Sequence, residues 1–248
     1  RSTLSSSSAA SDVYKRQLPE LIKNKSLIVF NDTKVIPARI IFHKSTGACI
    51  EIFLIEPVEP SIIIEQVMHC KGSCSWVCLI GNAKKWSNNV ILSIAVDHIE
   101  LSAKRLSRNR VQFSWSPEKT WSDLLLKLGN VPLPPYISRS SNIYDEKRYQ
   151  TVYSKLEGAV AAPTAGLHLT QEVLNELRKK HQLDYLTLHV SAGTFQPIKT
   201  NAGDHQMHRE QLRITRKNLI NLLENESVIA VGTTSLRSLA VSYTHLTL

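Results

Sequence analysis

The chain has 248 residues, of which 30 are Lys or Arg and 21 are Asp or Glu, so its formal net charge is +9. Hydrophobic residues make up 42% of the sequence, and this share and length are typical of a globular protein with at least one ordinary core. The strongest apolar runs, at residues 27–30 and 61–64, are only as long as strands, which excludes a transmembrane helix. The basic surplus favours an anionic partner such as nucleic acid without identifying one.

Residues 1–17 form a Ser-rich polar segment that lacks the apolar stretch of a secretory signal. Residues 240–248 look equally foreign to the rest of the sequence, and both ends resemble translated adapter sequence. We expect residues 1–17 to contribute nothing to the fold. The natural part is then predicted to run from Leu18 to Leu239.

Between residues 40 and 115 the sequence contains short strand-like segments separated by turn-rich pieces, with no convincing helix. The segments lie at residues 49–55, 75–80, 90–96 and 110–115. This pattern predicts a small antiparallel β-barrel or a sandwich. A short amphipathic helix is predicted to follow over residues 120–128, with Ser122 as its cap and Gly129 just past its end.

Three of the four cysteines, Cys70, Cys74 and Cys78, are spaced four residues apart. This is neither a CxxC pair nor the dense framework of a secreted protein. Alternation through residues 73–78 predicts a strand with Cys74, Trp76 and Cys78 on one face. We therefore expect buried, reduced thiols in a cytoplasmic protein rather than zinc ligands.

After a proline-rich crossing at residues 131–137, strand and helix patterns alternate. Strands are predicted at 158–162, 184–190 and 228–231, and helices at 170–181 and 215–225. This alternation indicates a mixed, mainly parallel α/β sheet. We expect an α/β core made of residues 18–40 and 130–239, with residues 41–129 inserted as the β-barrel domain.

Residues 158–170 form the densest group of small residues in the chain. Glycine and alanine expose the backbone to an approaching ligand, and Thr170 can cap the helix that follows. A loop between a parallel strand and a helix N-terminus is a common ligand site, but a tight turn selected for packing explains the composition equally well.

Strand alternation sends Thr187, His189 and Ser191 to one side of the next predicted strand. A buried polar face needs partners, so this face is predicted to line a cavity. The alternative is a strand at the edge of the sheet with its polar face in water.

Residues 205–210 place two histidines and a glutamate within six residues. A helical His-x-x-His-x-Glu segment can bind a metal, but the usual surrounding motif is missing, so acid–base work or substrate binding is the stronger reading.

Residues 228–237 form an apolar strand that ends in a glycine and three hydroxyl side chains, followed by Arg237. Such a turn can cradle an anion, although an ordinary helix cap explains the hydroxyls too.

Seven segments together, in order and spacing, carry a resemblance to one family. They are residues 31–39 (NDTKVIPAR), 132–136 (PLPPY), 148–153 (RYQTVY), 158–168, 188–195 (LHVSAGTF), 205–210 and 232–237. In these segments the chain resembles the S-adenosylmethionine:tRNA ribosyltransferase-isomerases of queuosine biosynthesis, from about Leu18 to Leu239.

The resemblance implies a cytoplasmic bacterial enzyme with an α/β core and an inserted β-barrel. Such an enzyme transfers and isomerises the ribosyl part of S-adenosylmethionine onto 7-aminomethyl-7-deazaguanine at the wobble position of tRNA. The products are epoxyqueuosine in tRNA, adenine and methionine. It implies S-adenosylmethionine and tRNA as substrates, and no metal, further cofactor or membrane; we expect a monomer.

This chemistry needs a base, an acid for the leaving adenine and a clamp on the ribose. We expect His168 or His189 to transfer protons, with His208 and Glu210 as rivals. The residues expected to bind the substrates are Asn31, Asp32, Thr33, Arg39, Arg139, Arg148, Tyr149, Gln150, Pro163, Thr164, Ala165, Gly166, Gly193, Thr194, Phe195, His205, Gly232, Thr233, Thr234, Ser235 and Arg237.

Two other functions are consistent with parts of the sequence. A methyltransferase would also use S-adenosylmethionine, but the glycine-rich first turn and the ribose-binding acid of that class are not evident. A non-catalytic tRNA-binding module would account for the basic charge and the inserted barrel. Neither explains the histidines at the predicted strand ends as well.

Overall fold

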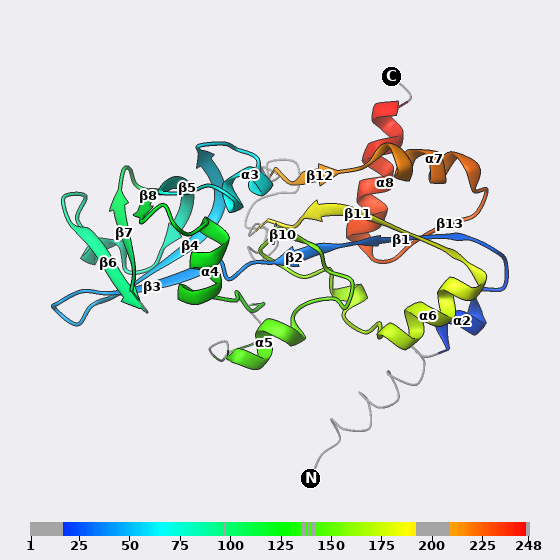
Figure 1. Ribbon diagram of the computed structural model, residues 1–248, viewed down its shortest axis with the longest axis horizontal. Helices are drawn as coiled ribbons and strands as arrows, with labels where there is room; N and C mark the ends of the chain where they lie inside the picture. Colours follow the sequence, from blue (N-terminus) through cyan, green and yellow to red (C-terminus); the bar gives the residue numbers. More distant parts are fainter. Residues whose placement is uncertain are drawn as a thin grey trace, which may run out of the picture.

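The computed structural model describes residues 17–96, 98–134, 137, 139, 142–191 and 209–246. Figure 1 shows two groups of elements, an α/β core around β1, β11 and β13, and an antiparallel region containing β3 to β8 with α4. Strand β2 (Thr33–Val35) connects the two groups and pairs in parallel with β10 (Leu156–Ala159). None of the helices in the described ranges is long and apolar enough to cross a membrane.

The core sheet has four strands in the order β12-β11-β1-β13. Strand β1 (Leu27–Asn31) pairs in parallel with β11 (Gln182–His189) and with β13 (Val228–Ala230), whereas β12 (Gln211–Arg213) runs antiparallel to β11. Every residue of β1 is buried, as expected of a central parallel strand covered on both faces. The predicted mixed, mainly parallel α/β sheet is confirmed.

The two faces of β1 pack against different helices. Ile28 and Phe30 contact the apolar side of α6 (Gln171–Lys180), near the short helix α2 (Leu18–Leu21). Leu27 and Val29 form a separate cluster on the opposite face, with Leu222 and Leu239 packed against it. The two-residue period of a strand explains this division.

Helices α7 (Arg216–Glu224) and α8 (Thr233–Leu246) supply the second layer of the core. Both predicted core helices begin at threonine caps. The Thr170 hydroxyl accepts a hydrogen bond from the Val173 N–H, and Thr215 forms a capping box before α7.

The antiparallel region is one curled sheet in which every neighbouring pair of strands is antiparallel. Its strand order is β6 (Ile91–Val96), β7 (Ile99–Arg105), β8 (Arg110–Trp115), β5 (Ser73–Ile80), β4 (Cys49–Glu59), β3 (Arg39–His43) and β9 (Gly129–Asn130). Within the described residues, the edge strands β6 and β9 do not pair. The predicted small barrel is therefore only half closed. Strand β9 is two residues long, and helix α4 (Trp121–Leu128) packs against β3 and β9.

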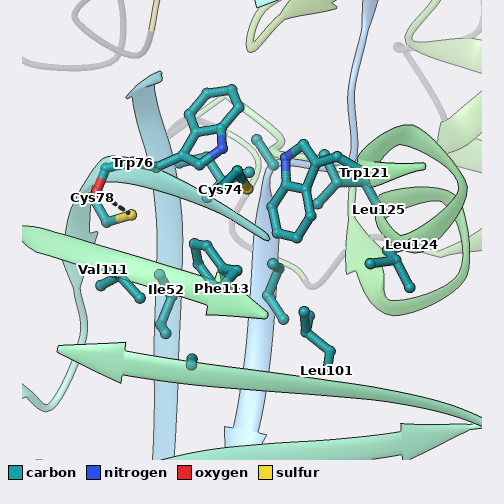
Figure 2. Close-up of a cluster of buried hydrophobic side chains, with 14 of the residues drawn as sticks. Ile52, Cys74, Trp76, Cys78, Leu101, Val111, Phe113, Trp121, Leu124 and Leu125 are labelled. Atoms are coloured by element: carbon teal, nitrogen blue, oxygen red, sulfur yellow. Dashed lines mark hydrogen bonds between the residues drawn. The ribbon is translucent and has the colours of Figure 1, made fainter. Parts of the chain in front are cut away.

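The interior of the curled sheet is apolar and rich in tryptophan (Figure 2). The Trp121 ring centroid lies 4.9 Å from that of Phe113 and 6.5 Å from that of Trp76. Cys74 and Cys78 are buried beside Trp76, as the strand alternation predicted, and burial raises the pKa of the Cys78 thiol. All four cysteines are free thiols.

Two local predictions were wrong. The region between residues 40 and 115 contains helix α3 (Ile64–Met68), which starts inside the apolar run at residues 61–64, and a 3-10 turn, η1 (Ala83–Lys85). Helical spacing lets Ile64, Val67 and Met68 all enter the apolar core. The cap of α4 is Thr120, which shares a capping box with Asp123, and not Ser122.

Candidate active site

A cavity of about 890 Å³ lies where the end of β11 meets β12 and the inserted helix α3. Its lining residues are Ile55, Glu56, Pro57, Ile62, Ile63, Ile64, Glu65, Gly158, Val160, His189, Val190, Ser191, Arg209, Glu210, Gln211, Leu212, Arg213, Ile214 and Arg237. The carboxyl ends of parallel strands are the usual place for a ligand in an open α/β sheet. This cavity is therefore the candidate active site.

Asn31 joins the ends of β1 and β11. Its amide oxygen accepts hydrogen bonds from the Leu188 N–H at 3.0 Å and the Thr33 N–H at 3.2 Å. Its amide nitrogen donates to the Leu188 carbonyl at 3.0 Å. The side chain is fully buried, so Asn31 acts within the protein by fixing the polar strand ends.

Asp32 and Thr187 form the next layer of this polar face. The Thr187 hydroxyl donates to the Asp32 carboxylate at 2.6 Å, and both residues are buried. Burial raises the pKa of Asp32 above its ordinary range, although this hydrogen bond and the charge of Lys155 oppose the rise. The predicted alternation of Thr187, His189 and Ser191 is confirmed as a buried face. The alternative of a wet edge strand is wrong, because β11 lies between β1 and β12.

His189 ends β11 and lines the cavity. Its Nδ1 lies 2.8 Å from the Thr33 hydroxyl oxygen, and Gly158 packs against the ring. Burial lowers the pKa of His189 to about 4, and the charge of Arg213 acts in the same direction. The imidazole is therefore neutral at physiological pH.

Glu210 reaches the same cavity from the segment that precedes β12. One carboxylate oxygen accepts a hydrogen bond from Arg237 at 2.5 Å, and the other accepts the Ser191 N–H at 3.4 Å. The Glu210 side chain is 10% exposed, whereas that of Arg237 is 47% exposed. Arg237 thus holds a carboxylate on the cavity wall while part of its guanidinium faces solvent.

Strand β12 connects the cavity to the antiparallel region. Gln211 accepts the Ile64 N–H at 3.0 Å and donates to the Ile62 carbonyl at 2.6 Å. Arg213 donates to both carboxylate oxygens of Glu65, each at 2.8 Å. These contacts hold α3 over one side of the cavity. Sequence patterns did not indicate Gln211, Arg213 or Glu65, because the pairing depends on where α3 packs.

The two predicted loops rich in small residues lie next to each other. A Cβ built on Gly232, whose φ is +85°, would lie 2.9 Å from the Ala165 Cβ. Gly166 packs directly against the Tyr153 hydroxyl. Thr164 and Thr233 are exposed beside this contact, Thr234 is half-buried and Pro163 is buried. Ser235 is fully buried and donates to the Val231 carbonyl, so its hydroxyl serves the start of α8.

Other predicted site residues lie outside the cavity lining. Arg39 lies in β3, where it covers the Phe53 ring and is 3.5 Å from Glu51. Arg139 pairs with Asp145 through two hydrogen bonds of 2.6 and 2.8 Å.

Gln150, Tyr149, Arg148 and His168 also lie outside the cavity lining. Gln150 makes two hydrogen bonds to the Val35 backbone, and Tyr149 is buried in a small apolar cluster. Arg148 and His168 are exposed. Gly193, Thr194, Phe195, His205 and His208 lie outside the described residues.

In the described part of the chain, no group of three His, Cys, Asp or Glu side chains is placed to hold a metal ion. The cavity instead combines a neutral imidazole, an Arg-paired carboxylate and a rim of charged side chains. Such a set can donate hydrogen bonds, accept a proton and bind a polar substrate without a metal.

Residues 3–247 match the family model described as "Queuosine biosynthesis protein". The chain belongs to this family. A relative from Trichlorobacter lovleyi, named S-adenosylmethionine:tRNA ribosyltransferase-isomerase, is 38% identical over 237 residues, which are 93% of this chain and 66% of the relative. A relative of the same name from Aromatoleum aromaticum is 42% identical over 229 residues, or 90% of this chain and 62% of the relative.

This member of the queuosine biosynthesis family therefore spans slightly less than two thirds of the length of those curated relatives. A solved structure of S-adenosylmethionine tRNA ribosyltransferase from Thermotoga maritima is 26% identical to it. The match covers 92% of this chain and 59% of that one, with a TM-score of 0.32.

Proposed function

We propose that the chain catalyses ribosyl transfer from S-adenosylmethionine to tRNA in queuosine synthesis. Membership of the family and the names of its relatives support this activity. The observation that carries the proposal for the site is the meeting of His189, Glu210 and Arg237 at one cavity by the strand ends. The acceptor proposed from the resemblance is 7-aminomethyl-7-deazaguanine at the wobble position.

The proposed reaction begins with two proton transfers. Loss of a proton from C5′ of the sulfonium substrate gives an ylide, and cleavage of the glycosidic bond expels adenine, which gains a proton. The aminomethyl nitrogen then loses a proton as it forms a bond to the rearranged ribosyl carbon, and the carbon–sulfur bond breaks to release methionine. The oxygen that remains closes the epoxide of epoxyqueuosine.

His189 and Glu210 are the proposed proton-handling pair, since both line the cavity. The low pKa of His189, about 4, keeps the imidazole neutral at the pH of the reaction. His168 remains a rival from the sequence, but it is exposed and is not among the cavity-lining residues. Arg237 is proposed to orient Glu210 and to meet a charged group of the substrate.

The loops around Thr164 and Thr233 are proposed to contact ribose or methionine groups, because both expose hydroxyl side chains beside the Ala165–Gly232 contact.

The formal charge of +9 supports tRNA as the macromolecular substrate. We also propose that the protein is a cytoplasmic monomer that needs no cofactor beyond S-adenosylmethionine. The proposed domains are a core of residues 18–40 and 130–239 and an insert of residues 41–129.

Adenine release tests the assignment of His189. The chain is incubated with S-adenosylmethionine and tRNA that carries the aminomethyl precursor, and adenine is measured by chromatography. His189→Gln is expected to lower kcat by about 100-fold or more, the usual contribution of a positioned proton-transfer group. His168→Gln is the matched control and is expected to change kcat by less than His189→Gln does. Equal losses in both variants would contradict the assignment, and S-adenosylhomocysteine in place of adenine would indicate a methyltransferase.

A further inference from the structure

We infer that Thr33 is a positioning residue that fixes His189 as the tautomer with its proton on Nε2, so that His189 presents an N–H donor to the cavity. This inference rests on the proposed function for its catalytic meaning. In the proposed function His189 transfers a proton as an acid or a base. The inference instead makes His189 a hydrogen-bond donor.

The first argument is the hydrogen bond between the two side chains. Thr33 Oγ1 lies 2.8 Å from His189 Nδ1, and the two residues are 0% and 7% exposed. Among the described residues, Nδ1 is the single side-chain or backbone partner of the Thr33 hydroxyl. A buried hydroxyl with one available acceptor donates its hydrogen bond to that acceptor, because leaving a buried donor unsatisfied costs free energy. Nδ1 then accepts, and the ring proton of a neutral imidazole must be on Nε2.

The second argument is the fixed orientation of the ring. A Cβ built on Gly158 would lie 2.9 Å from both His189 Cε1 and His189 Nδ1, and it would also overlap Ile64. The absence of a side chain at Gly158, whose φ is +150°, therefore leaves the space that the imidazole fills. Thr33 and Gly158 together hold the Nδ1 edge of the ring against the protein. Nε2 is the ring nitrogen left for the cavity, and it has no hydrogen-bond partner in the described part of the chain.

The third argument is the charge around the ring. Glu65 on α3 and Arg213 on β12 act on His189 in opposite directions, and they pair with each other at 2.8 Å. Glu210, Arg209 and Arg237 complete the charged groups of the cavity wall. The opposing charges of Glu65 and Arg213 leave burial as the dominant influence, so the ring stays neutral at physiological pH.

A neutral imidazole N–H stabilises negative charge that develops on a nearby nitrogen or oxygen. In the proposed reaction such charge develops on the leaving adenine and on the ribose oxygen. The base that removes the C5′ proton is then a different group, and the Glu210 carboxylate is the one that shares the cavity wall.

Nitrogen-15 NMR of the uniformly labelled chain tests the tautomer without any substrate. The chain has nine histidines, and the signals that disappear in His189→Gln identify His189. We expect a pyridine-like Nδ1 and a pyrrole-like Nε2, unchanged between about pH 5.5 and pH 8 because the pKa of His189 is about 4. A pyrrole-like Nδ1, or a ring that becomes protonated in this range, would overturn the inference.

Two substitutions at one position then test the part of Thr33. Thr33→Val keeps the branched shape but removes the hydroxyl, and it is expected to shift the Nδ1 signal toward the pyrrole side and to lower kcat for adenine release about tenfold with little change in KM. Thr33→Ser keeps the donor and is expected to restore the wild-type signals and most of kcat. An unchanged Nδ1 signal in Thr33→Val would show that Thr33 does not fix the tautomer. If the wild-type chain shows the expected tautomer but releases no adenine, the proposed function fails and the positioning of His189 stands.

Discussion

The antiparallel region and the strand ends of the α/β core use buried side chains in opposite ways. The antiparallel region buries all four tryptophans of the chain in an apolar interior. The strand ends of the core bury Asn31, Asp32 and His189, each with a specific hydrogen-bond partner. An apolar core stabilises the fold through the apolar surface it buries and through close packing, whereas a buried polar group is tolerated only where its hydrogen-bond partners are present.

This difference separates residues that hold the fold from residues that we propose prepare the chemistry. The cavity lies at the boundary, where α3 of the antiparallel region contacts β12 of the core through Gln211 and Arg213. Substitutions in the antiparallel region should therefore change stability, and substitutions at the strand ends should change both the response to pH and the turnover.

The largest expected effect is on the apolar interior. Phe113→Ala is predicted to lower the free energy of unfolding by about 3–5 kcal/mol, because Phe113 is fully buried against Trp121 and its loss leaves a cavity. Tryptophan fluorescence during urea unfolding measures this effect, since all four tryptophans lie in this region. Leu126→Ala on α4 is the control, because Leu126 is 54% exposed. Equal destabilisation by both substitutions would contradict the assigned core.

The second prediction concerns acid stability at the strand ends. The pKa of His189 is lowered from 6.5 to about 4, so below pH 6.5 the unfolded chain binds a proton that the folded chain does not. The folded state should lose stability as pH falls from 6.5 toward 4, by up to about 3 kcal/mol from this residue. His189→Gln should remove that part of the loss. Urea unfolding at pH 7 and pH 4.5 measures it, and identical pH dependence in both proteins would show that His189 is not buried as described.

A smaller effect is expected at the contact between Gly166 and Tyr153. A methyl group at position 166 would overlap the Tyr153 hydroxyl, so Gly166→Ala should cost about 1–3 kcal/mol through overpacking. Tyr153→Phe in the same chain should recover part of the loss, because it removes the overlapping oxygen. The double-mutant cycle is measured by thermal unfolding. Additive effects would mean that the two residues do not touch.

The smallest effect is expected where the two regions are joined by charge. Glu65 and Arg213 are about half exposed, so their pair should contribute only about 0.2–1 kcal/mol to stability. A double-mutant cycle with Glu65→Gln and Arg213→Gln measures this coupling at low and high salt. We expect the coupling to decrease with added salt, and a coupling of several kcal/mol would contradict the exposed geometry.

Local patterns predicted the core well. The buried run at residues 27–30 became β1, and the cap at Thr170 was correct, because both depend on short-range chemistry. Alternation also identified the polar face of β11. Strands β3 and β7 were not predicted, and helix α3 was missed because a short apolar run fits a strand or a buried helix equally well.

The candidate site was predicted less completely. His189, Glu210 and Arg237 were expected from the sequence and share the cavity wall. Arg39 carries the same charge as Arg237, but it lies in β3, where it contacts Phe53 and Glu51. Sequence alone could not show that Thr33 would face His189, since the two positions are 156 residues apart and meet only through the pairing of β1 with β11.

Adenine release from S-adenosylmethionine tests the central claim most directly. With tRNA carrying the aminomethyl precursor, the chain should release adenine and methionine in equal amounts, and omission of the tRNA or replacement of His189 by Gln should nearly abolish the release. A folded chain, as judged by circular dichroism, that binds both substrates and releases no adenine would contradict the claim.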